Sequence, residues 1–219
     1  MAIVTAQTGS RQIGPGQATR QRGSRGRLAQ WASLAALALA PAGLAACAPH
    51  RAPAAQADAA VGGPFTLINQ DGRPVDQSLL KGKWSVVFFG YTFCPDYCPT
   101  TLTTLGRTMD VLGPKAKDTQ VVFITIDPER DTPAAMKSYI SSRVFPKNIV
   151  GLTGTPAQIA QVAKAYKVYY QKEGTGSTYT MDHSTVIYLM DPNGRFVRPI
   201  ADGTPQQDAQ QIADAMQGA

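Results

Sequence analysis

The segment WSVVFFGYTFCPDYCPTTL, residues 84–102, decides the fold of this chain. Its first part, Trp84–Tyr91, is an almost unbroken run of apolar and β-branched residues, which is typical of a strand buried on both faces of a sheet. Two cysteines follow, and from Pro99 onward apolar residues recur at steps of three and four, the spacing of an amphipathic helix. The segment therefore predicts a central strand, a turn that carries Cys94 and Cys98, and a helix.

Strands and helices alternate through the rest of the chain. The turn Asp71-Gly72 separates two short strands, so the sheet begins with an N-terminal β-hairpin. Three Thr-Pro pairs each supply an N-cap residue and a proline for the first helical position. The expected strands are 65–68, 74–75, 84–91, 121–126, 184–190 and 196–200, with a short edge strand at 151–154, and the expected helices start at 99, 133, 156 and 205. This order predicts an α/β, thioredoxin-like fold in which helices flank a mixed central sheet.

The net charge of +6 arises at the N-terminus and does not indicate nucleic-acid binding. Residues 1–46 contain five arginines and no acidic residue, so the rest of the chain is close to neutral. Because a basic segment precedes the uncharged apolar stretch 28–46, this region has the order of a secretory signal peptide. The stretch ends in Leu44-Ala45-Ala46-Cys47, which resembles the lipobox of bacterial lipoproteins.

These features divide the chain into three parts. We expect a lipoprotein-type signal peptide at 1–46, a lipidated Cys47 that starts a flexible tether at 47–62, and a globular domain at 63–219. The alternative is an uncleaved membrane helix, which Pro41 and the short apolar stretch disfavour. Either anchor would hold the domain at the extracytoplasmic face of a bacterial membrane.

The chemistry of the domain is concentrated in Cys94, Cys98 and His183. The cysteines are spaced i, i+4 between a strand and a helix, at the strand end where open α/β sheets bind ligands. The helix N-terminus there should make the thiols ionise more readily than in water. A structural disulfide is disfavoured because so small a loop gains little from chain entropy. We therefore expect a redox-active or metal-binding pair.

The metal that this residue set suits is copper. Two thiolates suit Cu(I), and an added imidazole gives a three-ligand site that also accommodates Cu(II). His183 supplies that imidazole if strand 184–190 pairs with strand 84–91, because the loop before it then borders the cysteine turn. Zinc is less suitable, since structural zinc sites use four protein ligands and the domain offers three candidates.

Two other functions use cysteines on this fold. A thiol–disulfide oxidoreductase would use Cys94 and Cys98 as a redox pair and leave His183 incidental, although thioredoxin-type motifs have two intervening residues rather than three. A peroxiredoxin-type peroxidase needs a proline upstream of its cysteine, and residues 86–93 contain none.

Three separated segments resemble motifs of the Sco/SenC family of copper chaperones. They are GYTFCPDYCP at 90–99, DPERDTP at 127–133 and DHS at 182–184, in a match that spans 63–216. The resemblance implies a thioredoxin-like fold, a membrane anchor and one copper ion held by Cys94, Cys98 and His183. It implies a metallochaperone that delivers copper to, or reduces the cysteines of, the binuclear copper centre in subunit II of cytochrome c oxidase. Such a partner, or another copper protein, favours the periplasmic side of the plasma membrane.

Two aspartates in these motifs could support the ligands. Asp127 opens the second motif and would lie near the site, unless it is only a turn residue at a strand end. Asp182 could accept a hydrogen bond from the second ring nitrogen of His183, unless it is a loop carboxylate that faces solvent. Outside the cytoplasm the two thiols can also form a disulfide, so copper loading should require their reduced form.

Overall fold

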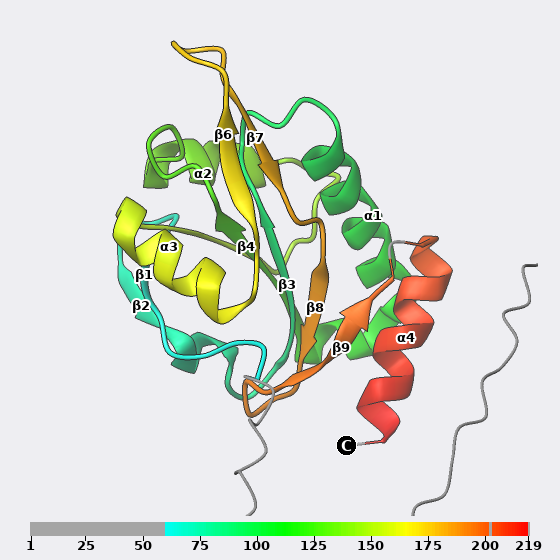
Figure 1. The fold of residues 1–219 in the computed structure, drawn as a ribbon. Coiled ribbons are helices and arrows are strands. Elements are labelled where there is room, and N and C mark those ends of the chain that lie inside the picture. The colour runs from blue at the N-terminus through cyan, green and yellow to red at the C-terminus, as the bar shows by residue number, and fades with distance from the viewer. Residues whose placement is uncertain (1–59, 202, 219) are drawn as a thin grey trace, which may run out of the picture. The chain divides into compact units, whose positions relative to one another are not determined.

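The computed structural model describes residues 60–201 and 203–218, which form a mixed α/β domain (Figure 1). The predicted signal peptide, the predicted lipidation site Cys47 and most of the tether lie outside this part of the chain. Within the described residues, no helix combines the length and the apolar character that crossing a membrane needs.

A seven-stranded mixed sheet forms the centre of the domain, in the order β2-β1-β5-β4-β3-β8-β9. β3 and β4 are parallel neighbours in its interior, and every residue of both strands is buried because both faces of the sheet are covered. β8 runs antiparallel to β3 on its other side. The strands of this sheet are β1 (Thr66–Asn69), β2 (Pro74–Asp76), β3 (Trp84–Gly90), β4 (Thr119–Thr125), β5 (Ile149–Thr153), β8 (Ile187–Met190) and β9 (Phe196–Ile200).

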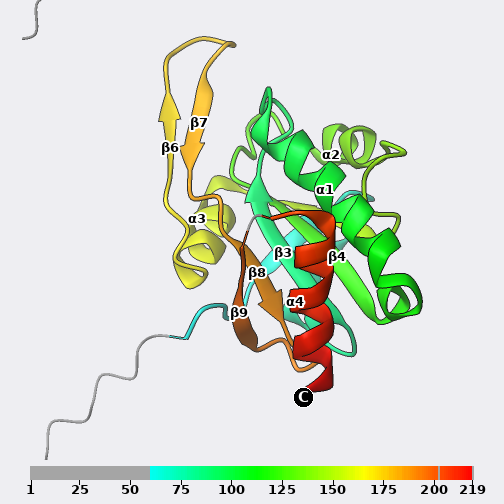
Figure 2. The ribbon, with the colours of Figure 1, turned by 90° about the vertical axis from the view of Figure 1, so that its right-hand side faces the viewer.

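Helices cover both faces of the sheet. Figure 2 shows α3 on one face and α1, α2 and α4 on the other. The helices are α1 (Tyr97–Leu112), α2 (Pro133–Ile140), α3 (Pro156–Ala165) and α4 (Pro205–Gln217), with the 3-10 helices η1 (Gln77–Leu80) and η2 (Gly113–Asp118). The predicted mixed α/β architecture with an N-terminal hairpin is confirmed.

The helices predicted from Thr-Pro pairs begin where expected. The hydroxyls of Thr132, Thr155 and Thr204 each accept a hydrogen bond from a backbone N–H in the first helical turn, which a proline starts. Helix α1 is different, because it begins at Tyr97 rather than at Pro99, so that Cys98 lies in its first turn.

Two parts of the sheet differ from the prediction. β5, expected at an edge, lies between β1 and β4, because the N-terminal hairpin pairs with its outer side. The residues just before β8, expected to continue that strand, instead follow a separate two-stranded sheet of β6 (Tyr170–Glu173) and β7 (Thr180–His183). His183, expected in a loop, therefore ends a strand. The sequence pattern does not reveal this hairpin, because YQKE and TMDH contain no apolar run.

Candidate metal centre

The turn between β3 and α1 holds Cys94 and Cys98 as free thiols. Cys94 is half-buried, whereas Cys98 is fully buried in the first turn of α1. The backbone N–H of Cys98 donates to the Sγ of Cys94 over 3.4 Å, so the start of the helix holds the first sulfur beside the second cysteine.

Room for the Cys98 sulfur comes from Gly90, the last residue of β3. A Cβ atom at Gly90 would lie 2.7 Å from the Cys98 Sγ and 2.8 Å from the Phe123 ring. Real Cβ atoms essentially never show contacts under 3.0 Å, so a glycine lets the helix start this close to the strand.

His183 reaches the same place from the end of β7. Its Nε2 lies 4.0 Å from the Cys98 Sγ, and its Nδ1 lies 2.9 Å from the carbonyl oxygen of Ser184. Because a carbonyl oxygen can only accept, Nδ1 carries the ring proton and the lone pair of Nε2 faces the sulfur. The Tyr91 ring packs edge-on against the imidazole, with ring centroids 6.1 Å apart. This tautomer can bind a metal ion through Nε2.

The Cys98 sulfur and the His183 imidazole lie near the separation that a shared soft metal ion requires. Bonds of about 2.3 Å to a thiolate and about 2.0 Å to an imidazole would place the two donor atoms about 3.7 Å apart in a trigonal site. The distance between the Cys98 Sγ and the His183 Nε2 is 4.0 Å, so a small side-chain movement would let these two atoms bind one ion. Among the residues that the structure describes, no three His, Cys, Asp or Glu side chains are already arranged around one metal position.

Burial raises the pKa of the Cys98 thiol, which corrects our expectation that the helix N-terminus makes this thiol easier to ionise. A backbone hydrogen bond at Tyr91 opposes the rise without cancelling it. Cys98 is therefore a neutral thiol in the metal-free protein at neutral pH. A metal ion that binds its sulfur has to displace the proton.

Asp131 fixes the cysteine turn to the end of β4. Its buried carboxylate accepts from the Thr92 N–H at 3.0 Å, from the Thr92 hydroxyl at 2.5 Å and from the Thr125 hydroxyl at 2.6 Å. Burial raises the pKa of Asp131, and these donors act against the rise. Since Thr92 is two residues before Cys94, this carboxylate determines where the turn leaves the sheet.

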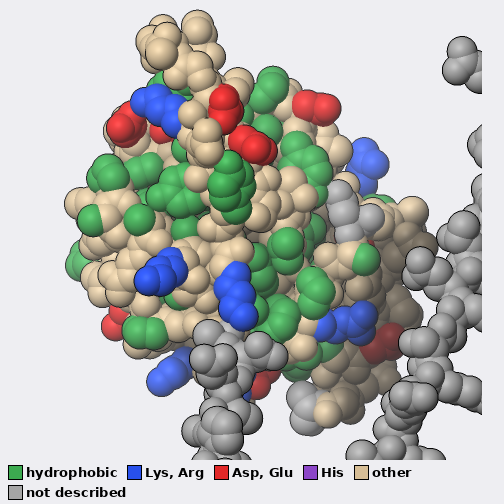
Figure 3. Space-filling view, viewed as in Figure 1, with side chains coloured by type: hydrophobic (Ala, Val, Ile, Leu, Met, Phe, Trp, Pro, Cys, Tyr) green, Lys and Arg blue, Asp and Glu red, His purple; other side chains and the backbone are tan. Residues whose placement is uncertain are grey.

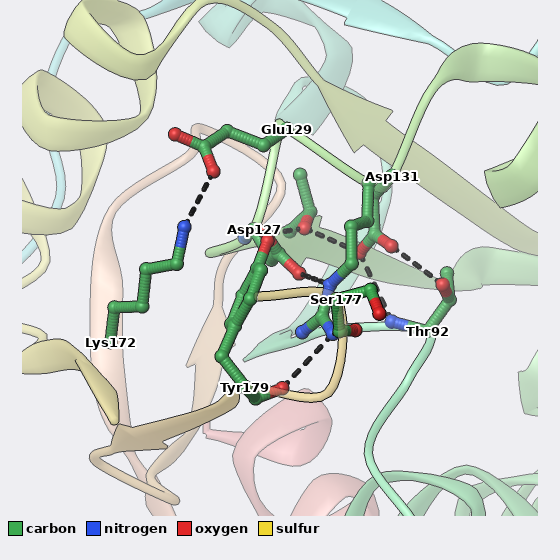
Figure 4. Close-up of polar contacts among 9 residues, drawn as sticks. Thr92, Asp127, Glu129, Asp131, Lys172, Ser177 and Tyr179 are labelled. Carbon is green, nitrogen blue, oxygen red and sulfur yellow. Dashed lines mark hydrogen bonds and ion pairs between the residues drawn. The ribbon is translucent and has the colours of Figure 1, made fainter. Parts of the chain in front are cut away.

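A second cluster joins the cysteine turn to the β6–β7 hairpin (Figure 4). Asp127 accepts a hydrogen bond from the Nε of Arg130 at 2.5 Å and one from the Tyr179 hydroxyl at 2.6 Å. The Arg130 guanidinium carbon lies 3.6 Å from the centroid of the Tyr179 ring and 4.5 Å from that of Phe93, the residue before Cys94. The structure thus engages the Asp127 carboxylate in a cluster that contacts both ligand-bearing segments.

The structure does not place Asp182 against the imidazole of His183. Neighbouring side chains of a strand point to opposite faces, and Asp182 is exposed while His183 is half-buried. The Ser184 carbonyl accepts from Nδ1 instead, so the role expected of Asp182 belongs to the backbone.

The sequence alone does not identify three residues that shape the site. Gly90, Arg130 and Asp131 supply no ligand, yet they shape or tie down the segments that do. Arg130 and Asp131 lie in the DPERDTP motif, but the linear sequence does not tell which of its acidic residues meets the cysteine turn.

The surroundings favour a cation at an open edge of the domain. Figure 3 shows acidic side chains around the β6–β7 hairpin together with a basic one, and the exposed Glu129 pairs with Lys172, while Glu173 and Asp182 are also exposed. A groove of about 800 Å³ lies between α1 and the segment 143–148, and none of the three predicted ligands lines it.

A model of the SCO1/SenC family matches residues 53–217 of the chain. Among curated proteins, mitochondrial SCO1 homolog 1 of Arabidopsis thaliana is 45% identical over 142 residues, which are 64% of this chain and 42% of that protein. The chain thus spans less than half the length of this relative.

Two solved structures show how far the similarity extends. ScoI of Bradyrhizobium japonicum with copper bound is 47% identical, with a TM-score of 0.66 over 71% of this chain and 99% of that one. BsSco, described as a Sco-family cytochrome c oxidase assembly protein with a disulfide switch, is 26% identical, with a TM-score of 0.58 over 72% and 92%. These similarities confirm the predicted thioredoxin-like fold.

Proposed function

Because this chain belongs to the SCO1/SenC family, we propose that it is a copper chaperone with one copper site formed by Cys94, Cys98 and His183. The observation that carries the proposal is the approach of the His183 Nε2 to 4.0 Å from the Cys98 Sγ, across a sequence separation of 85 residues. The copper bound to the similar Bradyrhizobium protein supports this choice of metal.

The proposed recipient of the copper is the binuclear centre of cytochrome c oxidase subunit II, or the site of another copper protein. The description of BsSco as an oxidase assembly protein supports this class of partner. Three protein ligands leave one position of a four-coordinate ion open to an incoming cysteine of the recipient. Because Cys94 is half-buried and Cys98 fully buried, exchange of ligands would begin at Cys94.

Copper in both common oxidation states is expected as cargo. The two thiolates suit Cu(I), and the imidazole also permits Cu(II). If the thiols instead lose two electrons and two protons to an oxidant, such as a partner disulfide, they form a disulfide with no thiolate left for the metal. Copper loading would therefore require reduced Cys94 and Cys98.

The second candidate function is an extracytoplasmic thiol–disulfide oxidoreductase that reduces the cysteines of the recipient centre. This second function is supported by the free thiols of Cys94 and Cys98 and by the disulfide switch described for BsSco. In that function His183 would be dispensable, which separates the two candidates.

We propose that the chain is anchored by a lipid on Cys47 after removal of residues 1–46, with its domain on the periplasmic side of the plasma membrane. The Leu44-Ala45-Ala46-Cys47 sequence supports this anchor. The wild-type protein of the membrane fraction should then have the mass of residues 47–219 plus a lipid, and Cys47→Ser should lack the lipid mass. Wild-type protein that keeps residues 1–46 and carries no lipid would point to an uncleaved helix instead.

A copper titration of the reduced full-length protein tests the main proposal. We expect a sulfur-to-Cu(II) charge-transfer band that saturates at one equivalent and disappears in Cys94→Ser and in Cys98→Ser. The Cys47→Ser variant is the matched control and should keep the band. A band that survives both Cys94→Ser and Cys98→Ser would contradict the site.

The variant His183→Ala distinguishes the two functions. A chaperone site should lose copper affinity when the imidazole is removed, whereas an oxidoreductase should keep its rate of disulfide exchange. Unchanged copper affinity together with full exchange activity would favour the oxidoreductase.

A further inference from the structure

The imidazole of the proposed site belongs to the β6–β7 hairpin, which pairs with no strand of the main sheet. β6 and β7 pair only with each other, and an isolated two-stranded hairpin is marginally stable at best. The position of His183 relative to the cysteines therefore depends on contacts between this hairpin and the body of the domain.

At its open end, next to the paired residues Tyr170 and His183, the hairpin is tied by backbone and side-chain bonds. The Ser184 N–H donates to the Tyr169 carbonyl at 2.9 Å, and the Tyr169 N–H donates to the Ser184 hydroxyl at 3.1 Å. These bonds join the two chain segments to each other rather than to the cysteine turn, so they leave the orientation of the hairpin to other contacts.

Arg130 supplies several of those contacts, beside the Tyr179 hydroxyl bond to Asp127 and the ion pair between Lys172 and Glu129. Its Nη1 donates to the Tyr179 carbonyl at 3.0 Å, while its guanidinium stacks on the Tyr179 ring, which begins the hairpin's return to His183. The same guanidinium lies over the ring of Phe93, and its Nε pairs with Asp127. One planar cation thus contacts the cysteine turn, the end of β4 and the hairpin at once.

We propose that Arg130 is a positioning residue for the copper site, which holds the β6–β7 hairpin against the cysteine turn so that His183 can close on copper. The inference rests on the proposed function, because it assigns a role toward the same site. It concerns how firmly the imidazole of His183 is positioned, and not whether the thiols bind copper.

The role requires the shape of arginine and not only its charge. A guanidinium offers a rigid fork of donors and two flat faces, whereas a lysine ammonium is a compact charge without a face to stack. In Arg130 the fork holds Asp127 and the Tyr179 carbonyl, and the faces meet the rings of Tyr179 and Phe93. Arg130→Lys should therefore weaken copper binding almost as much as Arg130→Gln does.

Copper binding to three variants of the full-length protein tests this role. We expect Arg130→Gln and Arg130→Lys to weaken Cu(II) affinity by about ten- to hundred-fold, the usual loss when an outer partner of a metal ligand is removed. Electron paramagnetic resonance should show weakened nitrogen coupling with the sulfur charge-transfer band retained. The control is Arg107→Gln, which removes an exposed arginine of α1 and should change neither readout.

A double variant separates positioning of His183 from general damage. If Arg130 acts through the imidazole, Arg130→Gln should cost less than about two-fold in a His183→Ala background, because the interaction is already lost. Equal losses in both backgrounds, or wild-type affinity and nitrogen coupling in both Arg130 variants, would overturn the proposal. Should the wild type itself lack the charge-transfer band, the proposed function fails, which is a different result.

Folding is checked in the same samples. Near-ultraviolet circular dichroism should match the wild type in at least one of the two Arg130 variants. The conclusion is drawn from that variant, and loss of the folded signal in both, with Arg107→Gln folded, would show a structural role and overturn the positioning role.

Discussion

At the scale of single residues, Gly90 sets how close helix α1 can come to the sheet. The Cβ of Gly90→Ala would meet the Cys98 Sγ and the Phe123 ring at under 3.0 Å, so the sulfur or the ring must move. Overpacking of this kind costs about 1–3 kcal/mol of unfolding free energy, and a displaced sulfur should also weaken copper binding. Urea unfolding and the copper titration measure the two effects.

Gly63→Ala is the control for that substitution. Its Cβ would have 3.5 Å to the nearest atom, on Ala165, which is an ordinary contact. Its stability should stay level or rise by up to about 1 kcal/mol, as for other strain-free changes from glycine to alanine. Equal behaviour of the two variants would show that Gly90 is not required for space.

The buried thiol of Cys98 makes the stability of the metal-free protein depend on pH. Its pKa is raised in the folded state, so above about pH 8.5 the unfolded chain releases a proton that the folded chain keeps. Unfolding free energy should therefore fall as pH rises from about 8 to 9.5, before tyrosines begin to titrate near pH 10. Cys98→Ala should show a shallower fall in denaturant titrations under reducing conditions, and an identical slope would refute the assignment.

At this scale the sequence singles out candidate donors but does not reveal their environment. Cys94, Cys98 and His183 stand out because sulfur and imidazole are rare and chemically distinctive. The ionisation of Cys98 could not be predicted, since the helix N-terminus and burial act in opposite directions and only the packing decides which is stronger. The Ser184 carbonyl, and not the Asp182 carboxylate, accepts the hydrogen bond from the His183 Nδ1. This depends on the course of strand β7, which the sequence does not show.

At the scale of elements, Asp131 links the cysteine turn to β4. Asp131→Ala would leave the Thr92 N–H and the hydroxyls of Thr92 and Thr125 without their acceptor. Each buried donor left unpaired costs about 1–3 kcal/mol, and a hydroxyl that finds another partner reduces the sum. We expect a loss of at least about 2 kcal/mol in urea unfolding.

The exposed Asp118 at the end of η2 gives the matching control. Asp118→Ala should change stability by less than about 0.5 kcal/mol, as surface substitutions usually do. A comparable loss in both variants would mean that the contacts of Asp131 do not anchor the turn.

Elements with an uninterrupted apolar run could be predicted, and those without one could not. β3 and β4 each contain an apolar run, at 86–89 and 121–124, and the pairing of β8 with β3 brings His183 near Cys98, as the topology suggested. The β6–β7 hairpin has mostly exposed, polar side chains and is held by contacts that are distant in sequence, such as those of Arg130. Its strands thus lack the local pattern on which prediction depends.

At the scale of the whole molecule, copper should stabilise the folded domain through mass action. A ligand at a thousand times its dissociation constant adds about 4 kcal/mol to the unfolding free energy. Thermal unfolding with and without Cu(I) under reducing conditions should show this as a rise in Tm. The rise should shrink in His183→Ala and vanish after oxidation of the two thiols, and an undiminished rise in the oxidised protein would contradict the site.

The division of the proposed ligands between two parts of the domain has a consequence for recognition. Two sulfurs belong to the packed sheet and helix, while the nitrogen belongs to a projecting arm that pairs with no strand of that sheet. A bound copper ion would therefore cross-link the hairpin to the body of the domain. The backbone amide protons of the hairpin would exchange faster in the copper-free protein than in the copper-bound protein. A recipient that binds the β6–β7 hairpin would thereby distinguish the copper-loaded from the copper-free protein by the mobility of the hairpin, without contacting the ion itself.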